Sequence, residues 1–161
     1  MNKSLLITGI PGTGKTETGD FLRDNHGYDH LDIEVILNTG KFGPQWLDKV
    51  EEMIKNNSSK TGTVVTWGFR PPDDVAHIER LRSTGLTMFW FDGNRTGARK
   101  AFNERGTVQE VYLDIQLKFI NQFDIKGHFN PIVYNSFDEA GSFKPKKQIV
   151  EEILDLLEKD S

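Results

Sequence analysis

The chain has 161 residues, contains no cysteine and carries a formal net charge of −4 from 20 basic and 24 acidic residues. The length suits one domain with a buried core, so we expect residues 1–161 to form a single domain. The absence of cysteine excludes disulfide frameworks and thiolate metal sites, and the slight acidity gives no general attraction for nucleic acid. The first residues run straight into an apolar strand pattern without a signal peptide, and no apolar run approaches about 18 residues. We expect a cytoplasmic monomer with neither a membrane nor a nucleic-acid partner.

Apolar runs typical of strands alternate with helical patterns, which predicts an α/β fold with a parallel sheet and helices on both faces. The predicted strands lie at 5–8, 28–32, 63–67, 86–91 and 131–135. Apolar spacing and flanking glycine or proline residues predict helices at 14–25, about 44–54, 72–82, 94–105, about 108–123 and 145–157. The segment 138–145 has the weakest pattern.

The residues after the first predicted strand match the pattern G-x-x-x-x-G-K-[ST] at every fixed position. In order they are Gly9, Ile10, Pro11, Gly12, Thr13, Gly14, Lys15 and Thr16. A strand before this pattern and a helix after it are typical of a phosphate-binding loop. Its glycines let the backbone amides point inward, and these amides and the helix N-terminus attract an anion.

Two side chains of this loop predict the cofactors. Lys15 offers a mobile cation to the outer phosphates, and the Thr16 hydroxyl is a ligand for Mg²⁺. The sequence therefore predicts a nucleoside triphosphate site with ATP and Mg²⁺ as cofactors, although it does not decide between ATP and GTP.

Five strands, a phosphate-binding loop after the first strand and a late arginine-rich helix resemble the small P-loop kinases. These include the adenylate kinase-like nucleoside monophosphate kinases and the shikimate and gluconate kinases. The stretches 6–9 and 14–16 look very like an adenylate kinase opening. The resemblance implies a three-layer α/β/α P-loop NTPase fold with a five-stranded parallel sheet in the order 2-3-1-4-5. It also implies an acceptor-side region at about 33–62 and a short lid at about 94–107.

Two carboxylates, Asp32 and Glu34, stand at the end of the second predicted strand. Shikimate and gluconate kinases carry a D-x-D pattern there. The resemblance implies that Asp32 helps to hold Mg²⁺ through water and that Glu34 or Asp32 orients or deprotonates the acceptor hydroxyl. Helix capping is the alternative, with Asp32 as N-cap of a helix that begins at Ile33 and Glu34 in its first turn. The two roles are compatible.

A basic cluster of Arg95, Arg99, Lys100 and Arg105 follows the fourth predicted strand. Arg95 and Arg99 share a helix face. The resemblance places the cluster in the lid, where arginines cover ATP and stabilise charge on the transferred group. It implies catalytic roles for Arg99 and Arg105 and nucleotide binding by Arg99. A solvated basic helix face is the ordinary alternative.

The third predicted strand departs from the family pattern. Adenylate kinases have D-G-F-P-R at its end, whereas this chain has Trp67 in place of the acid, followed by Gly68, Phe69 and then Arg70. An indole cannot serve the hydration shell of a cation, so Asp32 would carry that task alone. Trp67 is interpreted as core or as a stacking wall for a planar substrate. Arg70 is the candidate to bind a substrate anion.

The acceptor side lacks arginine, since none occurs between Arg23 and Arg70. Lysine does not reproduce bidentate phosphate recognition, so a hydroxyl acceptor is favoured over a nucleoside monophosphate, although Lys41 and Arg70 could substitute. Phe42 and Trp46 are interpreted as core or as substrate-facing. The four histidines, which have no ligand spacing and are interpreted as structural or surface residues, are His26, His30, His77 and His128.

The predicted function is an ATP-dependent small-molecule kinase that transfers the γ-phosphoryl group to a hydroxyl or phosphate acceptor. The predicted substrate-binding residues are Asp32, Glu34 and Arg70, and the predicted metal ligands are Thr16 and Asp32. The predicted catalytic residues are Lys15, Asp32, Glu34, Arg99 and Arg105. One alternative is a nucleoside monophosphate kinase of the adenylate kinase type, and the other is a catalytically weak nucleotide-binding regulatory module, favoured by Trp67.

Overall fold

The computed structural model describes residues 3–57, 59, 61–93, 95–105 and 110–160, and for residues 95, 105 and 110 it describes the backbone alone. Its strands pair in parallel throughout, in the order β2-β3-β1-β4-β5. The strands are β1 (Leu5–Gly9), β2 (Asp29–Asp32), β3 (Thr63–Thr66), β4 (Thr87–Asp92) and β5 (Ile132–Asn135). The predicted sheet and its strand order are confirmed.

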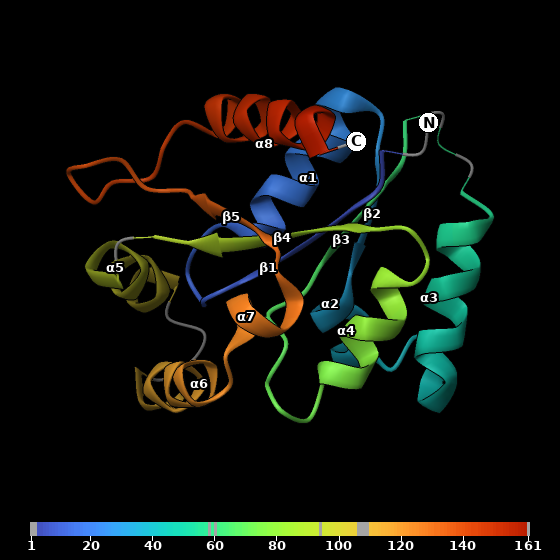
Figure 1. Ribbon diagram of the computed structural model, residues 1–161, viewed down its shortest axis with the longest axis horizontal. Coiled ribbons are helices and arrows are strands. Elements are labelled where there is room, and N and C mark those ends of the chain that lie inside the picture. Colours follow the sequence, from blue (N-terminus) through green and yellow to red (C-terminus); the bar gives the residue numbers. More distant parts are fainter. Residues whose placement is uncertain (1–2, 58, 60, 94, 106–109, 161) are drawn as a thin grey trace.

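Helices cover both faces of this sheet (Figure 1), as a parallel sheet requires. They are α1 (Lys15–His26), α2 (Ile33–Thr39), α3 (Trp46–Lys55), α4 (Val75–Arg82), α5 (Arg95–Arg105), α6 (Glu110–Gln122), α7 (Ile125–Phe129) and α8 (Lys146–Asp160), with the short 3₁₀ helix η1 (Gly43–Gln45) before α3. No helix of the described residues combines the length and the apolar character that crossing a membrane requires.

Alternating side chains of the strands build two separate cores. Leu5 and Ile7 of β1 are fully buried on the side of α1 and α8, while Leu6 between them is buried on the side of α3 and α4. This alternation follows from the period of two in a strand. The α1–α8 core contains Leu22 and Ile153, and the two cores give the expected three layers.

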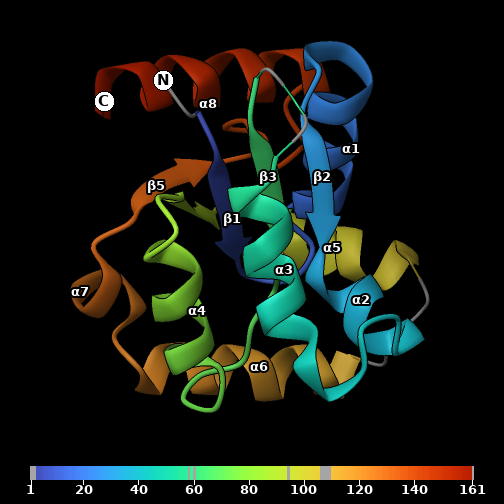
Figure 2. The ribbon, with the colours of Figure 1, turned by 90° about the vertical axis from the view of Figure 1, so that its right-hand side faces the viewer.

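The order of the strands fixes where a ligand site belongs. Strands β2 and β3 lie on one side of β1, and β4 and β5 lie on the other, so the strand order reverses at β1. Such a switch point leaves a crevice at the carboxyl end of the strand. Figure 2 shows α2 and α6 beyond the carboxyl ends of β1 and β2.

Two helices differ from the prediction. The helix predicted at 72–82 begins at Val75, because a turn precedes it in which the Asp74 amide donates to the Arg70 carbonyl at 3.1 Å. Helix α7 was not predicted, because five residues are too few to show a helical period. Its N-cap is Asp124, whose side chain accepts from the Gly127 amide, and its C-cap is Asn130 in the left-handed region. Of the helix predicted at about 108–123, the residues before 110 lie outside the described ones.

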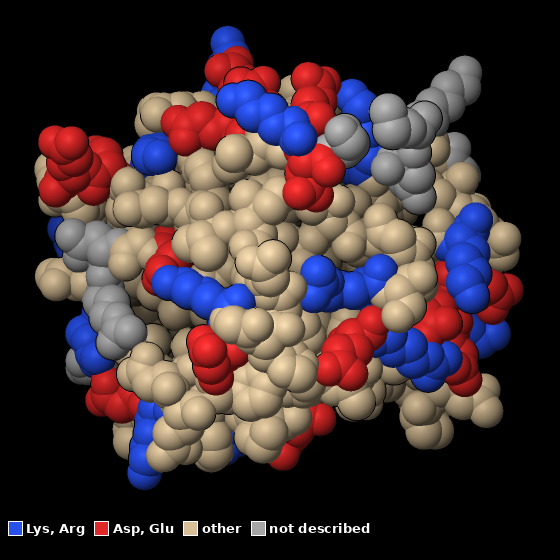
Figure 3. Space-filling view, viewed as in Figure 1, with Lys and Arg blue, Asp and Glu red and all other residues tan. Residues whose placement is uncertain are grey.

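Acidic and basic side chains are interspersed on the face that Figure 3 shows. The described residues form several ion pairs, such as Lys126 with Asp92 at 2.7 Å and Lys3 with Glu158 at 3.1 Å. Exposed pairs of this kind contribute little to stability. Their mixing gives this face no large patch of one sign.

Strand β3 carries a buried hydroxyl that suits a stability test. The Thr63 side chain is 1% exposed, and its hydroxyl has no hydrogen-bond partner within the described structure. Replacing it with valine removes a desolvated polar atom at nearly constant shape. We expect Thr63→Val to raise the free energy of unfolding by about 1 kcal/mol and the melting temperature by about 2–4 °C in calorimetry.

The matched control is Thr8→Val in the neighbouring strand. Thr8 is also buried, but its hydroxyl donates to the Phe89 carbonyl at 2.8 Å, so this substitution should lower the melting temperature. A lower melting temperature for Thr63→Val as well would show that the Thr63 hydroxyl contributes a stabilising contact.

Candidate active site

The loop between β1 and α1 packs so closely on its neighbours that it admits no side chain at two positions. A Cβ atom at Gly9 would overlap the carbonyl oxygen of Phe91, and one at Gly12 would overlap the carbonyl oxygen of Ala98. Gly12 and Gly14 have φ angles of 78° and 81°, in the left-handed region that glycine enters without strain. The loop therefore forms a tight arch over the first turn of α1.

Internal hydrogen bonds stabilise this arch. The Ile10 carbonyl accepts from the Thr13 hydroxyl at 2.8 Å and from the Lys15 ammonium at 2.9 Å, and the Ile10 amide donates to the Phe91 carbonyl. The Lys15 ammonium thus lies within the arch. An amide-lined arch at a helix N-terminus with an enclosed cation is suited to bind phosphate groups.

The two oxygens of the Asp32 carboxylate have different partners. One accepts from the Val35 amide at 3.3 Å and so caps α2, as the capping alternative expected. The other accepts from the Thr16 hydroxyl at 2.9 Å. Asp32 therefore joins the end of β2 to the first turn of α1 while it also begins α2.

Thr16 and Asp32 fit the predicted Mg²⁺ ion by the chemistry of their donors. Mg²⁺ prefers oxygen ligands and is usually held by one or two protein groups together with water and phosphates. Within the described ranges, no cluster of three or more histidine, cysteine or acidic residues forms a protein cage for a metal. A hydroxyl and a carboxylate beside a phosphate-binding loop are the donor set that a nucleotide-bound Mg²⁺ requires.

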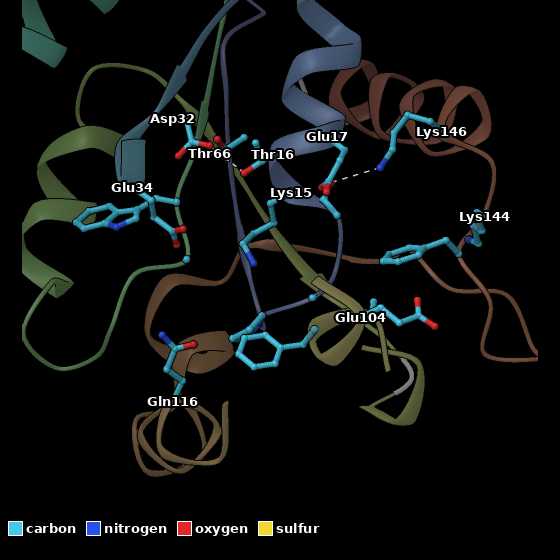
Figure 4. Close-up of a pocket in the computed structure, with 18 residues that line it drawn as sticks. Lys15, Thr16, Glu17, Asp32, Glu34, Thr66, Glu104, Gln116, Lys144 and Lys146 are labelled. Atoms are coloured by element: carbon cyan, nitrogen blue, oxygen red, sulfur yellow. Dashed lines mark hydrogen bonds between the residues drawn. The ribbon is translucent and has the colours of Figure 1, made fainter. Parts of the chain in front are cut away.

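Glu34 and Lys15 converge at the end of β3. A Cβ atom at Gly68 would lie 2.9 Å from Oε1 of Glu34 and 3.7 Å from Nζ of Lys15, so the two charged groups share the space above this glycine. Figure 4 shows both side chains pointing into the same cavity. A carboxylate beside the phosphate-binding lysine is well placed to contact a second substrate.

These residues line one cavity of about 560 Å³. Its size is typical of small-molecule sites. The sequence predictions did not assign several of its lining residues to the site. These are Glu17, Thr66, Ala101, Phe102, Glu104, Gln116, Phe143, Lys144 and Lys146.

The wall near α8 comes from the segment with the weakest sequence pattern. The Phe143 ring stacks on Phe137 with a centroid distance of 4.5 Å and keeps 42% of its surface exposed. Lys146 donates to the Thr18 hydroxyl at 3.2 Å and to the Gly14 carbonyl at 3.4 Å. Burial lowers the pKa of Lys146, and the nearby Glu17 carboxylate opposes that shift. Because Lys146 meets the loop across more than 120 residues of sequence, spacing alone could not reveal it.

The structure does not bring Arg70 or Arg99 into this cavity. The Arg99 guanidinium donates to Asp114 of α6 at 2.7 Å, and the Arg70 guanidinium lies over the Phe119 ring at 4.6 Å from its centroid. Neither residue is among those that line the cavity. The Arg105 side chain lies outside the described residues, so its role and those of Arg70 and Arg99 stay predictions.

Trp67 is a core residue at the edge of the cavity, and stacking of a planar substrate on its ring stays a prediction. It is 4% exposed and contacts Trp46 edge to face at 5.6 Å between ring centroids, so it belongs to the core. It also lines the cavity beside Gly68. Phe42 and Trp46 are half-buried and pack on the core.

Several solved structures have a similar fold. No family model matches the chain. A gluconokinase from Sinorhizobium meliloti 1021 superposes with a TM-score of 0.65 at 18% identity, over 97% of this chain and 91% of that one. A shikimate kinase from Bacteroides thetaiotaomicron superposes with a TM-score of 0.61 at 14% identity, over 96% of this chain and 98% of that one. The fold is that of the small P-loop kinases.

A third solved structure has the same fold, and one curated protein matches part of the sequence. A sugar kinase from Janibacter sp. HTCC2649 superposes with a TM-score of 0.65 at 17% identity, over 98% of this chain and 95% of that one. A tRNA-2-methylthio-N(6)-dimethylallyladenosine synthase from Photobacterium profundum is 31% identical over 84 residues, which are 52% of this chain. The match spans only 16% of the length of that synthase, so the named activity of the synthase does not indicate the function of this chain.

The two bonds of Asp32 allow its capping role to be separated from its charge. Asparagine caps a helix as well as aspartate does, so Asp32→Asn should change the free energy of unfolding by less than about 0.5 kcal/mol, whereas Asp32→Ala should lower it by about 1 kcal/mol. Both variants should lose Mg²⁺-dependent nucleotide affinity, because both lose the carboxylate charge. Urea unfolding and calorimetric titration measure the two effects. Wild-type Mg²⁺–ATP affinity in Asp32→Asn would rule out the metal role.

Proposed function

We propose that the protein is an ATP-dependent small-molecule kinase that transfers the γ-phosphoryl group of ATP to a hydroxyl group of its acceptor. The observation that carries this proposal is the 2.9 Å contact between Thr16 and Asp32 in the cavity that Lys15 and Glu34 also line. Phosphoryl transfer requires positioning and charge neutralisation more than covalent chemistry. These four side chains supply the groups that such a transfer needs.

Each part of the site has a role in this proposal. The loop amides and Lys15 bind the β- and γ-phosphates, and Thr16 and Asp32 hold the metal beside them. Bound Mg²⁺ supplies charge neutralisation at the phosphates. Glu34 accepts a hydrogen bond from the acceptor hydroxyl and takes its proton during transfer.

The role of the lid arginines depends on a rearrangement of Arg99. Arg99 stabilises charge on the transferred group after it exchanges its bond with Asp114 for one with phosphate, and Arg105 acts with it. The exposed ring of Phe143, at the other end of the cavity, offers a flat apolar surface against which the nucleotide base packs.

The charges around the cavity favour a hydroxyl acceptor over a phosphate acceptor. Its basic lining residues, within the described part of the chain, are Lys15, Lys144 and Lys146, and none of them is an arginine. The side formed by Asp32 and Glu34 is acidic and repels a second phosphate. This supports the small-molecule kinase over the nucleoside monophosphate kinase. The replacement of an acid by Trp67 at the end of β3 favours the third candidate, a nucleotide-binding module with weak turnover.

Lys15→Ala tests the nucleotide site directly. Loss of a charge-assisted contact costs about 1.5–3 kcal/mol, so ATP affinity should fall by roughly tenfold to more than a hundredfold. Lys147→Ala is the matched control, since Lys147 is 79% exposed on α8. Calorimetry in the presence of Mg²⁺ measures both variants, and unchanged affinity in Lys15→Ala contradicts the nucleotide site.

The acceptor class is tested by ATP consumption in the presence of nucleotides, sugars, hydroxy acids and aminoglycosides. We expect a hydroxyl compound to support turnover and AMP, CMP, GMP and UMP to be poor acceptors, because the cavity offers no arginine fork for their phosphate. Turnover of about 1–100 s⁻¹ with any nucleoside monophosphate would favour the adenylate kinase type instead. Tight Mg²⁺–ATP binding without consumption by any acceptor would favour the regulatory module.

A further inference from the structure

A buried histidine joins helix α1 to the end of strand β3. The His30 side chain is 3% exposed. Its Nδ1 lies 3.0 Å from Oδ1 of Asp20 on α1, and its Nε2 lies 2.8 Å from the Thr66 hydroxyl on β3. Asp20 is half exposed, so this chain of contacts runs from the surface of α1 to the cavity that Thr66 lines.

Helix α1 has a glycine where the His30 ring lies. A Cβ atom at Gly19 would overlap the ring, since all three of its nearest atoms belong to that imidazole. Glycine inside a helix is destabilising relative to alanine, and no positive φ angle at Gly19 requires it. The close approach of the ring gives this glycine a physical reason.

The two partners of His30 determine which way each hydrogen bond runs. The Asp20 carboxylate is an acceptor, so the proton of a neutral His30 ring lies on Nδ1, and Nε2 is then an acceptor. The Thr66 hydroxyl must donate to Nε2. Its oxygen therefore keeps its lone pairs for another donor, and Thr66 is one of the residues that line the cavity.

Thr66 lies directly beside the proposed metal ligands. It pairs in register with Asp32 across β2 and β3, so their side chains share one face of the sheet. Asp32 accepts from Thr16, and Figure 4 shows the three side chains next to one another. The next residue along β3 is Trp67, whose indole cannot accept a hydrogen bond from a metal-bound water.

We propose that the Thr66 hydroxyl accepts a hydrogen bond from the water shell of the nucleotide-bound Mg²⁺, and that His30 and Asp20 are positioning residues that hold it as an acceptor. The inference rests on the proposed kinase site. The Thr66 hydroxyl would accept from metal-bound water, as an acidic side chain at the end of β3 would. Asp32 is then not the only side chain that serves the hydration shell of the metal.

Thr66→Val tests the hydroxyl while it keeps a β-branched side chain in the strand. ATP affinity is measured by calorimetry with Mg²⁺ and with EDTA, for wild type and variant. The tightening by Mg²⁺ is the ratio of the ATP affinity with Mg²⁺ to that with EDTA. We expect this ratio to fall about tenfold, as for the loss of one hydrogen bond to a charged group, with the affinity in EDTA unchanged. Thr66→Ser should restore the wild-type tightening. Thr63→Val is the matched control, because Thr63 is a buried threonine of the same strand whose hydroxyl has no partner within the described residues.

Asp20→Ala tests the positioning residues at a half-exposed position, because alanine removes the acceptor of the Nδ1 hydrogen bond. Asp24→Ala is its control, because both aspartates lie on α1 and contact Arg23. We expect Asp20→Ala alone to reduce the effect of Mg²⁺ on ATP affinity. In wild type, ¹⁵N NMR of the His30 ring should show a protonated Nδ1 and an unprotonated Nε2.

The outcomes separate this inference from the proposed function. A wild-type chain that does not bind Mg²⁺–ATP contradicts the proposed function and the inference with it. A wild-type chain that binds, together with a Thr66→Val variant of lower stability but undiminished tightening by Mg²⁺, contradicts the inference alone. A ring protonated on Nε2 in wild type also overturns it, because Thr66 would then accept from His30.

Discussion

The close approach of the phosphate-binding loop to β4 and α5 is the constraint on which the site depends. Gly9 and Gly12 touch the backbones of Phe91 and Ala98 so closely that neither position has room for a Cβ atom. These contacts hold the loop against β4 and α5. Gly12, Gly14 and Lys15 line the cavity, and the strand order places Asp32 of β2 and Glu34 of α2 on its other side.

On the acidic side of the cavity, Asp32 has both a structural role and a proposed catalytic role. Asp32 begins α2 with one oxygen and contacts Thr16 with the other, so the arrangement that folds the acceptor side also sets the position of the proposed metal ligands. Lys15 and Glu34 then meet above Gly68, where a larger residue would separate them. Charge, cavity shape and local folding all favour a donor phosphate beside a polar acceptor.

Local patterns predicted what depends on neighbouring residues, and tertiary contacts decided the rest. The loop motif and the capping of α2 by Asp32 could be predicted because each depends on residues within a few positions. The sheet order followed from the family resemblance. The contact of Lys146 with the loop, and the burial of His30 against Gly19, could not be predicted because they join distant segments. Helix α7 was missed because it is too short to show a period.

The most direct test of the kinase account is ³¹P NMR of ATP incubated with the protein, Mg²⁺ and a mixture of hydroxyl compounds. The account predicts that the γ-phosphate signal is replaced by that of a phosphate monoester, that ADP accumulates in equal amount, and that neither change occurs with Lys15→Ala. Release of inorganic phosphate alone, or intact ATP bound without change in the presence of every acceptor, would contradict it.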